Sequence, residues 1–321
     1  MKSGVWGLFV LSVLAQPVLA QLAFPEKPVR VINPFPPGSP VEFVGRLFAD
    51  RLSKVWGKPV LLESRAGAGG TIGAAFVAKS APDGYTLLVT TPSTIAVAPA
   101  LYKTLPYDPV KEFAGIWAVH SAGLVVVVNP KLPIQSISDL LAYAKNNPGK
   151  VAYASSGVGT TQHLAAELFK SRTGADLMHV PYKGGAPASA DLMAGHVHVM
   201  FDALSNVRAA VLDGRLRGLA VLRSKRARAL PDLPTATEAG ISGVEQPGWI
   251  GLFAPSATPK DILARLVTTT AKEMADPDVV AKLMGAGNDN EYTVGDELTR
   301  KLAADNLLFA EIVKRAGIPK E

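Results

Sequence analysis

A glycine-rich loop that ends in Ser and Thr carries the clearest chemical signal in this sequence. It runs Ser155-Ser156-Gly157-Val158-Gly159-Thr160-Thr161-Gln162-His163, between a predicted strand and a predicted helix. Backbone N–H groups at a helix N-terminus are unpaired and partially positive, so they favour an anion. Hydroxyls add donors, and glycines let a ligand approach the backbone. The loop predicts a carboxylate site that needs no arginine. A capped turn without ligand is the alternative, as is a phosphate site, although the lysine of a P-loop is missing.

Two more candidate positions follow predicted strands. The loop from Phe35 to Glu42 opens a helix at the carboxyl end of the first strand, which is the edge of a parallel sheet where ligands bind. Asp202 directly follows another strand, where it either orients a polar group of a ligand or caps the next helix. A third loop, 67–73, resembles a dinucleotide fingerprint, but G-x-G-x-x-G would require glycine at Ile72, so a simple turn is favoured.

Catalytic and metal-binding patterns are poorly represented. The sequence has neither G-x-S-x-G nor H-E-x-x-H, and it has no cysteine. His196 and His198 share a predicted strand face, but no third ligand stands at a matching position. His163 is expected to be packed or hydrogen-bonded rather than to act as a base. We therefore predict no catalytic residue, no metal and no cofactor.

A basic cluster near residue 220 requires a separate explanation. It contains Asp213 as its one acid, and its members are Arg208, Arg215, Arg217, Arg223, Lys225, Arg226 and Arg228. Nucleic-acid binding would favour aromatic residues among these charges, and none is present. A solvated face is the favoured interpretation, with docking to a transporter as the alternative.

The elements that must position these loops alternate between strand and helix, which is typical of parallel α/β sheets. Strands are predicted at 29–32, 60–62 and 85–89, with helices at 43–56 and 72–81. A second series has strands at 124–128, 151–154, 178–181, 197–201 and 219–222, with helices at 137–145, 160–172, 187–194 and from 204 onward. After a proline-flanked run at 247–255, the chain is predicted to be helical to its end, with a last helix at about 296–316.

This order predicts two lobes rather than two successive domains. The chain should leave the first α/β unit near 123–129, build a second unit, and return near 247–251. Two crossings of this kind are typical of a hinged cleft. We expect lobe 1 to contain residues 21–124 and 249–321 and lobe 2 to contain residues 125–248, each with a mainly parallel sheet flanked by helices.

Composition limits the class of protein. The chain has 321 residues, 48% of them hydrophobic, and a formal net charge of +6. The length favours two domains with substantial cores, and the composition is that of a globular protein. The absence of cysteine excludes disulfide scaffolds, thiolate metal sites, cysteine nucleophiles and a cysteine-borne lipid anchor.

Residues 1–20 have the pattern of a cleaved signal peptide. Lys2 precedes an apolar run from Val5 to Leu14, and a small-residue ending closes at Ala20. The run is too short for a typical membrane span. The mature protein is therefore predicted to be soluble in the periplasm.

An ordered set of short segments carries a family resemblance over nearly all the mature chain. These segments are 31–38 (VINPFPPG), 63–70 (ESRAGAGG), 82–87 (PDGYTL), 105–109 (LPYDP), 153–157 (YASSG), 179–184 (HVPYKG) and 200–202 (MFD). From about Phe24 onward the chain resembles the Bug/TctC family, the periplasmic solute-binding proteins of tripartite tricarboxylate transporters.

The resemblance implies a periplasmic binding protein-like fold of type II, the Venus flytrap, that captures a small organic carboxylate. It also implies delivery to a two-component integral-membrane permease, by a monomer that is not an enzyme and does not bind nucleic acid. In the family, backbone amides, hydroxyls and ordered water hold the ligand carboxylate. Carried over by position, the binding residues are Phe35, Ser39, Thr91, Ser93, Ser155, Gly157, Gly159, Thr160 and Thr161, with Asp202 at the edge of the cleft.

One segment departs from the family pattern. Where the family continues with glycines, Thr and Asp, this chain has Gly38-Ser39-Pro40-Val41-Glu42. Pro40 lacks a backbone donor, Val41 lacks a hydroxyl, and Glu42 replaces the shorter acid as a binding candidate. We therefore expect altered ligand specificity. An exported α/β hydrolase or transferase and a ligand-presenting sensor subunit remain the competing functions.

Overall fold

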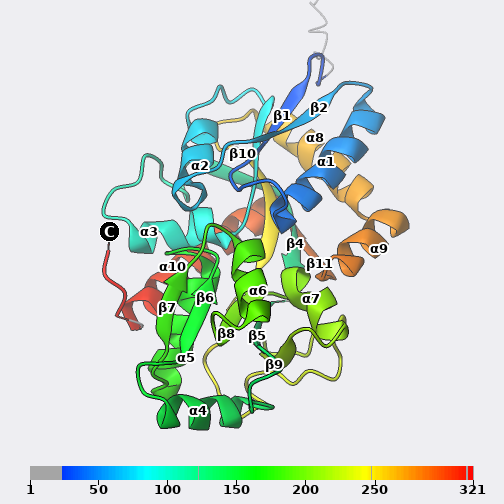
Figure 1. The fold of residues 1–321 in the computed structure, drawn as a ribbon. Helices are drawn as coiled ribbons and strands as arrows, with labels where there is room; N and C mark the ends of the chain where they lie inside the picture. The colour runs from blue at the N-terminus through cyan, green and yellow to red at the C-terminus, as the bar shows by residue number, and fades with distance from the viewer. Residues whose placement is uncertain (1–23, 122, 247, 316, 321) are drawn as a thin grey trace, which may run out of the picture.

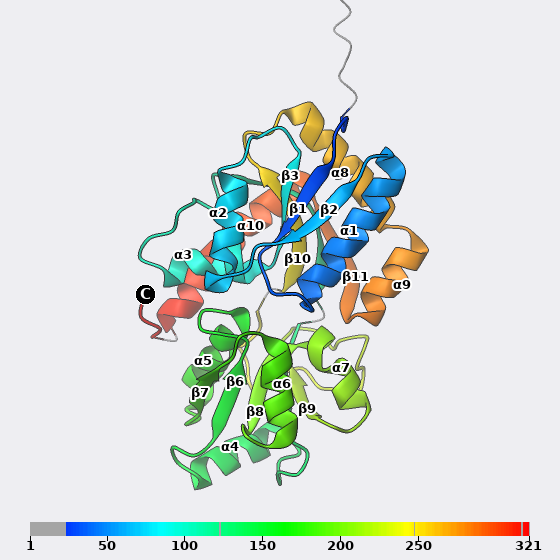
Figure 2. The ribbon, with the colours of Figure 1, turned by 45° about the horizontal axis from the view of Figure 1, so that its top comes forward.

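The strands of this protein form two separate sheets, one of six strands and one of five. They are seen in a computed structural model that describes residues 24–121, 123–246, 248–315 and 317–320. Figures 1 and 2 show helices packed around each sheet, with the two sheets in different halves of the molecule. The predicted two-lobed α/β fold is confirmed. The predicted signal peptide, residues 1–20, lies outside the described residues.

Lobe 1 is built from the first and last parts of the chain. Its sheet has the order β11-β4-β10-β3-β1-β2. The strands are β1 (Val29–Asn33), β2 (Val60–Ser64), β3 (Thr86–Thr90), β4 (Phe113–Ser121), β10 (Trp249–Pro255) and β11 (Asn288–Val294). The helices are α1 (Pro40–Trp56), the 3-10 turn η1 (Ala68–Gly70), α2 (Thr71–Ala78), the π-helical turn η2 (Ser93–Val97), α3 (Ala98–Leu101), α8 (Lys260–Met274), α9 (Pro277–Gly285) and α10 (Gly295–Arg315).

Lobe 2 is built from the middle of the chain. Its sheet has the order β7-β6-β8-β5-β9. The strands are β5 (Leu124–Val128), β6 (Ala152–Ser155), β7 (Met178–Pro181), β8 (Val199–Ala203) and β9 (Arg217–Val221). The helices are α4 (Ile137–Asn146), α5 (Thr161–Thr173), α6 (Gly185–Ala194) and α7 (Leu204–Leu212).

Both sheets are mixed. The predicted parallel pairing holds in one half of each sheet, where β1 pairs with β2 and β3, and β6 pairs with β7 and β8. In the other half, β10 is antiparallel to β3 and β4, β11 is antiparallel to β4, and β5 is antiparallel to β8 and β9. Strands β4 and β10 are the last before and the first after the chain's passage through lobe 2.

The chain passes between the sheets twice. It leaves lobe 1 after β4, which ends at Ser121, and enters β5 at Leu124; it leaves lobe 2 after β9, which ends at Val221, and enters β10 at Trp249. One hydrophobic cluster continues across both lobes, because it contains Val97 of η2, Leu168 of α5 and Phe309 and Ile312 of α10. Helix α10 therefore supports lobe 1 and also contacts lobe 2.

Capping residues fix where the helix after β1 begins and ends. Ser39 is the N-cap of α1, and its Oγ accepts the Glu42 N–H at 3.2 Å. Pro40 occupies the first helical turn, where a missing N–H has no cost. Gly57 ends α1 in the left-handed conformation with φ 62°. Capping residues thus fix both ends of α1, the helix that follows the loop after β1.

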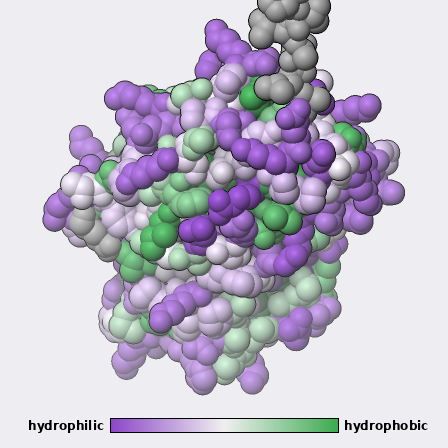
Figure 3. All heavy atoms as spheres, turned by 90° about the horizontal axis from the view of Figure 1, so that it is seen from above, coloured by the Kyte–Doolittle hydropathy of each residue, from purple (hydrophilic) through white to green (hydrophobic). Residues whose placement is uncertain are grey.

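The surface at the free end of lobe 1 is mostly hydrophilic. Figure 3 looks onto this end, where hydrophobic residues form small groups separated by hydrophilic ones. Within the described residues, no helix combines the length and the apolar character needed to cross a bilayer.

Candidate functional site

The predicted ligand loops follow the carboxyl ends of neighbouring parallel strands. In lobe 1, Phe35 follows β1 while Thr91 and Ser93 follow β3, and these strands are paired. In lobe 2, the loop 156–160 follows β6, and Asp202 lies near the end of its partner β8. Figure 2 shows the loop after β1 on the side of lobe 1 nearest to lobe 2. The topology therefore brings the predicted positions to two edges that lie between the lobes.

A hydrogen bond joins these two edges. The backbone N–H of Thr161, in the first turn of α5, donates to Ser93 Oγ at 3.2 Å, and the two hydroxyl oxygens are 3.5 Å apart. Thr161 belongs to lobe 2 and Ser93 to lobe 1. An N-terminal donor of α5, the kind of group that binds anions, thus lies at the junction of the lobes.

Close packing beside this bond requires glycine. Gly159 has φ 74°, and a Cβ atom added to it would lie only 2.8 Å from Cδ1 of Leu101 in α3. Both the left-handed conformation and the lack of space therefore demand glycine here. The loop predicted from its glycines approaches the opposite lobe at this position.

The loop 155–160 is stabilised by its own polar groups. Ser155 Oγ accepts the Gly157 N–H at 3.2 Å, and Thr160 Oγ1 donates to the Gly157 carbonyl oxygen at 2.8 Å. Thr160 is also the N-cap of α5, because its hydroxyl accepts the His163 N–H at 3.4 Å. The side chains of Ser155 and Thr160 are buried, so in this structure they shape the loop rather than line an open surface.

A serine–histidine pair lies behind the loop. Ser155 Oγ is 2.7 Å from His179 Nε2, and the His179 ring stacks between those of Tyr153 and His163, at centroid distances of 4.7 and 4.2 Å. Burial, together with the nearby His163, lowers the pKa of His179 to about 4. His163 is packed, as predicted. Sequence patterns missed the Ser155–His179 pair because the two residues come from different strands.

Asp202 connects two helices of lobe 2. Its fully buried carboxylate accepts hydrogen bonds from Gln162 Nε2 at 3.2 Å, Asn206 Nδ2 at 3.0 Å and the Ala203 N–H at 2.7 Å. Burial raises the pKa of Asp202 to about 6, and these hydrogen bonds oppose the increase. Asp202 is not the N-cap of α7, because Ala203 occupies that position. Gln162 and Asn206 were not predicted, since a lone amide gives no sequence signal.

Three helix N-termini meet around this carboxylate. Gln162 is in the first turn of α5, and Asn206 is in the first turn of α7. A Cβ atom added to Gly185, the first residue of α6, would lie 3.1 Å from Asp202 Oδ2 and 2.8 Å from Asn206 Nδ2. Because helix N-termini are partially positive, this part of lobe 2 favours negative charge without any arginine in the group.

The residues that depart from the family pattern form the start of α1. The Glu42 carboxylate accepts the Gly38 N–H at 2.5 Å and pairs with Arg46, and these contacts lower the pKa of Glu42. Pro40 is in the first turn, and Val41 is buried in the core of lobe 1. Phe35, half-buried, donates its N–H to Asn33 Oδ1 at 3.1 Å. The side chains of Val41 and Glu42 thus have structural contacts of their own.

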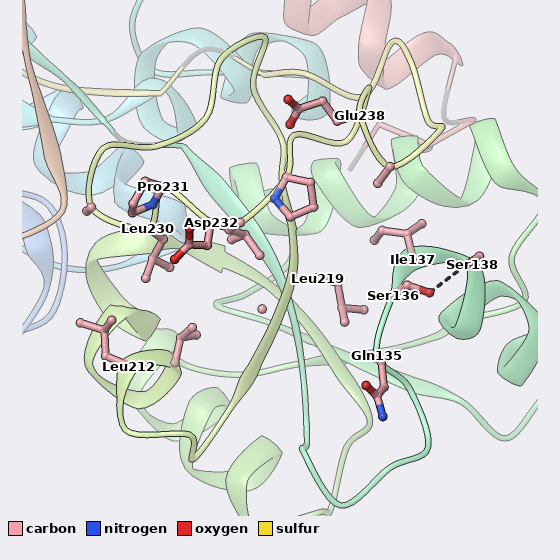
Figure 4. A pocket seen from close by; sticks show the side chains of 16 residues that line it. Gln135, Ser136, Ile137, Ser138, Leu212, Leu219, Leu230, Pro231, Asp232 and Glu238 are labelled. Carbon is pink, nitrogen blue, oxygen red and sulfur yellow. Dashed lines mark hydrogen bonds between the residues drawn. The ribbon is translucent and has the colours of Figure 1, made fainter.

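The predicted positions do not line the wide cavity of lobe 2. This cavity of about 580 Å³ lies between the start of α4, the end of α7, β9 and the segment 229–239 (Figure 4). None of the predicted binding residues contributes to its lining. It therefore belongs to a different part of lobe 2.

The two histidines considered for metal binding have other neighbours. His196 Nδ1 lies 3.3 Å from Asp191 Oδ1, and His198 Nδ1 accepts the Ala152 N–H at 3.1 Å. In the part of the chain that the structure describes, no three His, Asp or Glu side chains are grouped as metal ligands.

Comparisons with known proteins give consistent results over the whole fold. Residues 44–317 match the family described as tripartite tricarboxylate transporter family receptor, TctC. Protein BugT of Bordetella pertussis is 36% identical over 319 residues, covering 99% of this chain and 96% of BugT. The solved structure of R. palustris Rpa4515 with adipate has a TM-score of 0.86 at 35% identity, covering 93% of this chain and 100% of that one. MatC from Rhodopseudomonas palustris with bound malate has a TM-score of 0.80 at 29% identity, covering 90% and 100%.

Proposed function

The chain belongs to the TctC family of tripartite tricarboxylate transporter receptors, and from this membership we propose that it binds a small organic carboxylate between its two lobes. We further propose that it acts in the periplasm and delivers this ligand to a two-component membrane permease. The ligands named for the two structural neighbours, adipate and malate, are both dicarboxylates, and this supports the proposed ligand class.

The observation that carries the proposal is the contact between Thr161 and Ser93. It places a first-turn N–H group of α5 where both lobes meet. An anionic ligand at this position would interact with the partial charge of the helix and with donors of both lobes, so its binding would favour the closed arrangement. The proposed ligand groups are the backbone of 156–161, the hydroxyls of Thr161 and Ser93, and the loop residues Phe35, Ser39 and Thr91.

Binding can be tested directly by titration calorimetry of the mature protein with adipate, malate and a panel of mono-, di- and tricarboxylates. We expect saturable binding of at least one dicarboxylate. Adipate and malate should bind with unequal affinity, because residues 38–42, at the start of α1, differ from the family pattern. A panel without any binding would contradict the proposed ligand class.

A charge substitution tests the position of the site. Thr161→Glu adds an acid to the first turn of α5, which is compatible with the helix dipole but repels an anionic ligand. We expect an affinity loss of about tenfold or more, since a like charge a few ångströms away costs on the order of 1–4 kcal/mol. Ser138→Glu makes the same change in the first turn of α4, away from the predicted residues, and should bind normally. Equal affinity in both variants would move the site elsewhere.

One observation bears on the competing enzymatic function. The Ser155–His179 pair has the separation of a nucleophile and a base, but Ser155 is fully buried, so a substrate carbonyl has no access to its hydroxyl in this structure. We therefore propose a binding protein rather than a hydrolase. Turnover of a p-nitrophenyl ester that is lost in Ser155→Ala would reverse this conclusion.

A further inference from the structure

The structure divides the basic cluster into paired and unpaired arginines. Arg215 pairs with Asp213 at 3.1 Å, Arg226 with Glu238 at 2.9 Å, and Arg223 with Asp289. Arg217 donates to the Ile134 carbonyl oxygen at 2.9 Å. By contrast, neither Arg208 nor Arg228 has a carboxylate of the described residues within ion-pair distance.

Both unpaired arginines line one small cavity at the junction of the lobes. The cavity has a volume of about 260 Å³. Lobe 2 contributes Arg208 of α7 and Arg228 of the segment after β9, and lobe 1 contributes Met284 and Gly285 at the end of α9 and Asn288 and Asp289 of β11. The turn before β11 also touches α7, because a Cβ atom on Gly287 would lie 2.8 Å from Ser205 Cα.

The charge in this cavity is not balanced by the described side chains around it. Asp289 is its one acid, and Asp289 is already engaged by Arg223. Arg208 Nε is buried and has no hydrogen-bond partner among the described residues. A buried donor without a partner is unfavourable, and a charged one more so. An additional acceptor with negative charge would satisfy it.

The end of α9 does not supply this acceptor. Helix C-terminal carbonyls attract cations, but here they have other donors. Asn288 Nδ2 donates to the Leu283 carbonyl oxygen at 3.2 Å, and the Gly287 N–H donates to that of Met284 at 3.0 Å. The arginines therefore do not serve as the cap of this helix.

We propose that this cavity is a second anion site, in which Arg208 and Arg228 bind a small oxyanion such as inorganic phosphate or sulfate. Guanidinium groups match the geometry of tetrahedral oxyanions through pairs of N–H donors. The cavity has about the volume of eight or nine water molecules, so such an ion fits with part of its hydration shell. Because both lobes contribute to its lining, an ion bound here also strengthens the lobe junction.

The test is a thermal-unfolding titration with sodium phosphate and with sodium sulfate, at ionic strength held constant with sodium chloride. The wild-type protein should show a saturable increase in midpoint temperature. Arg208→Gln and Arg228→Gln should each weaken the apparent affinity by about tenfold or more, as expected for loss of a charge-assisted contact. Arg215→Gln, a matched change at an exposed paired arginine of lobe 2, should leave the response unchanged.

Two results would overturn the proposal. One is an equal response in Arg208→Gln, Arg228→Gln and Arg215→Gln, because it would mean general screening of positive charge. The other is loss of the phosphate response in Thr161→Glu, because it would mean that phosphate binds at α5. A phosphate response kept in Thr161→Glu would support a separate site, whatever the outcome for the carboxylate function.

Discussion

Among single residues, Asp202 combines burial with charge in a way that gives a measurable pH dependence. Its carboxylate is fully buried and its pKa is raised to about 6 by that burial. In the unfolded chain the pKa of aspartate is about 3.9. Between these values the folded protein holds a proton that the unfolded chain has lost. The contribution to stability is therefore complete below about pH 4 and is lost as pH rises through 6.

This difference predicts the behaviour of Asp202→Asn. Between pH 4 and pH 7, the free energy of unfolding of the wild type should fall by about 2 kcal/mol relative to the variant. Urea unfolding at several pH values measures it. The control is Asp139→Asn: the Gln135 N–H lowers the pKa of the half-buried Asp139, so this variant should give a difference of opposite sign. Parallel curves for wild type and Asp202→Asn would contradict the assignment.

At the scale of elements, Gly159 allows the loop 155–160 to contact α3. Gly159→Ala should destabilise the protein by the cost of a left-handed alanine, about 1 kcal/mol, and should also push Leu101 away. We expect weaker carboxylate binding as well, measured by calorimetry, because the lobes then meet less closely.

A matched glycine separates these two effects. Gly174 ends α5 with φ 70° and has no atom within 4 Å of an added Cβ, so Gly174→Ala should lower stability but leave affinity unchanged. Adding Leu101→Ala to Gly159→Ala should restore affinity by making room. If Gly159→Ala and Gly174→Ala bind ligand equally well, the contact with Leu101 has no part in closure.

The sequence predicts a helix or strand correctly when the residues that determine it are neighbours in the chain. The run Leu124–Val128 predicts its strand correctly, and Gly57 and Thr160 mark helix ends, because burial pattern and capping are local. Strands β4, β10 and β11 were not predicted, and β11 lies in a part of the chain that was predicted to be helical. β11 begins with Asn288, Asp289 and Asn290 and pairs with β4 through a register shift, so only tertiary pairing makes it a strand.

The residues of the candidate site likewise fall into those that the sequence predicts and those that only the fold brings together. Loop composition indicates the donors of 155–161, since Gly, Ser and Thr before a helix have a local meaning. The group of Asp202, Gln162, Asn206 and Gly185 comes from four elements that meet in space, and a single sequence contains no signal for that meeting. The lobe boundaries at 124 and 248 and the ligand residues themselves stay predictions.

At the scale of the whole molecule, side chains next to the points where the chain crosses between the lobes hold the two lobes together. Arg223 follows β9 in lobe 2, and its side chain packs on Gly123 of the first crossing, where an added Cβ atom would lie 2.6 Å from Arg223 Cδ. Its partner Asp289 is in β11 of lobe 1, next to Asn288, which is paired with Ser121 of β4. The side chains are only 18% and 10% exposed, so this largely buried ion pair joins the two lobes beside the first crossing.

Arg223→Gln leaves Asp289 charged, largely buried and without its ion-pair partner, and should lower the free energy of unfolding by about 3 kcal/mol. It should also increase the radius of gyration measured by small-angle X-ray scattering, because the crossing is less restrained. The double variant Arg223→Gln with Asp289→Asn should recover most of the stability, since no buried charge is left without a partner. Arg226→Gln breaks an exposed pair within lobe 2 and should cost at most about 0.5 kcal/mol. If Arg223→Gln matched Arg226→Gln in both measurements, the ion pair would have no role in holding the lobes together.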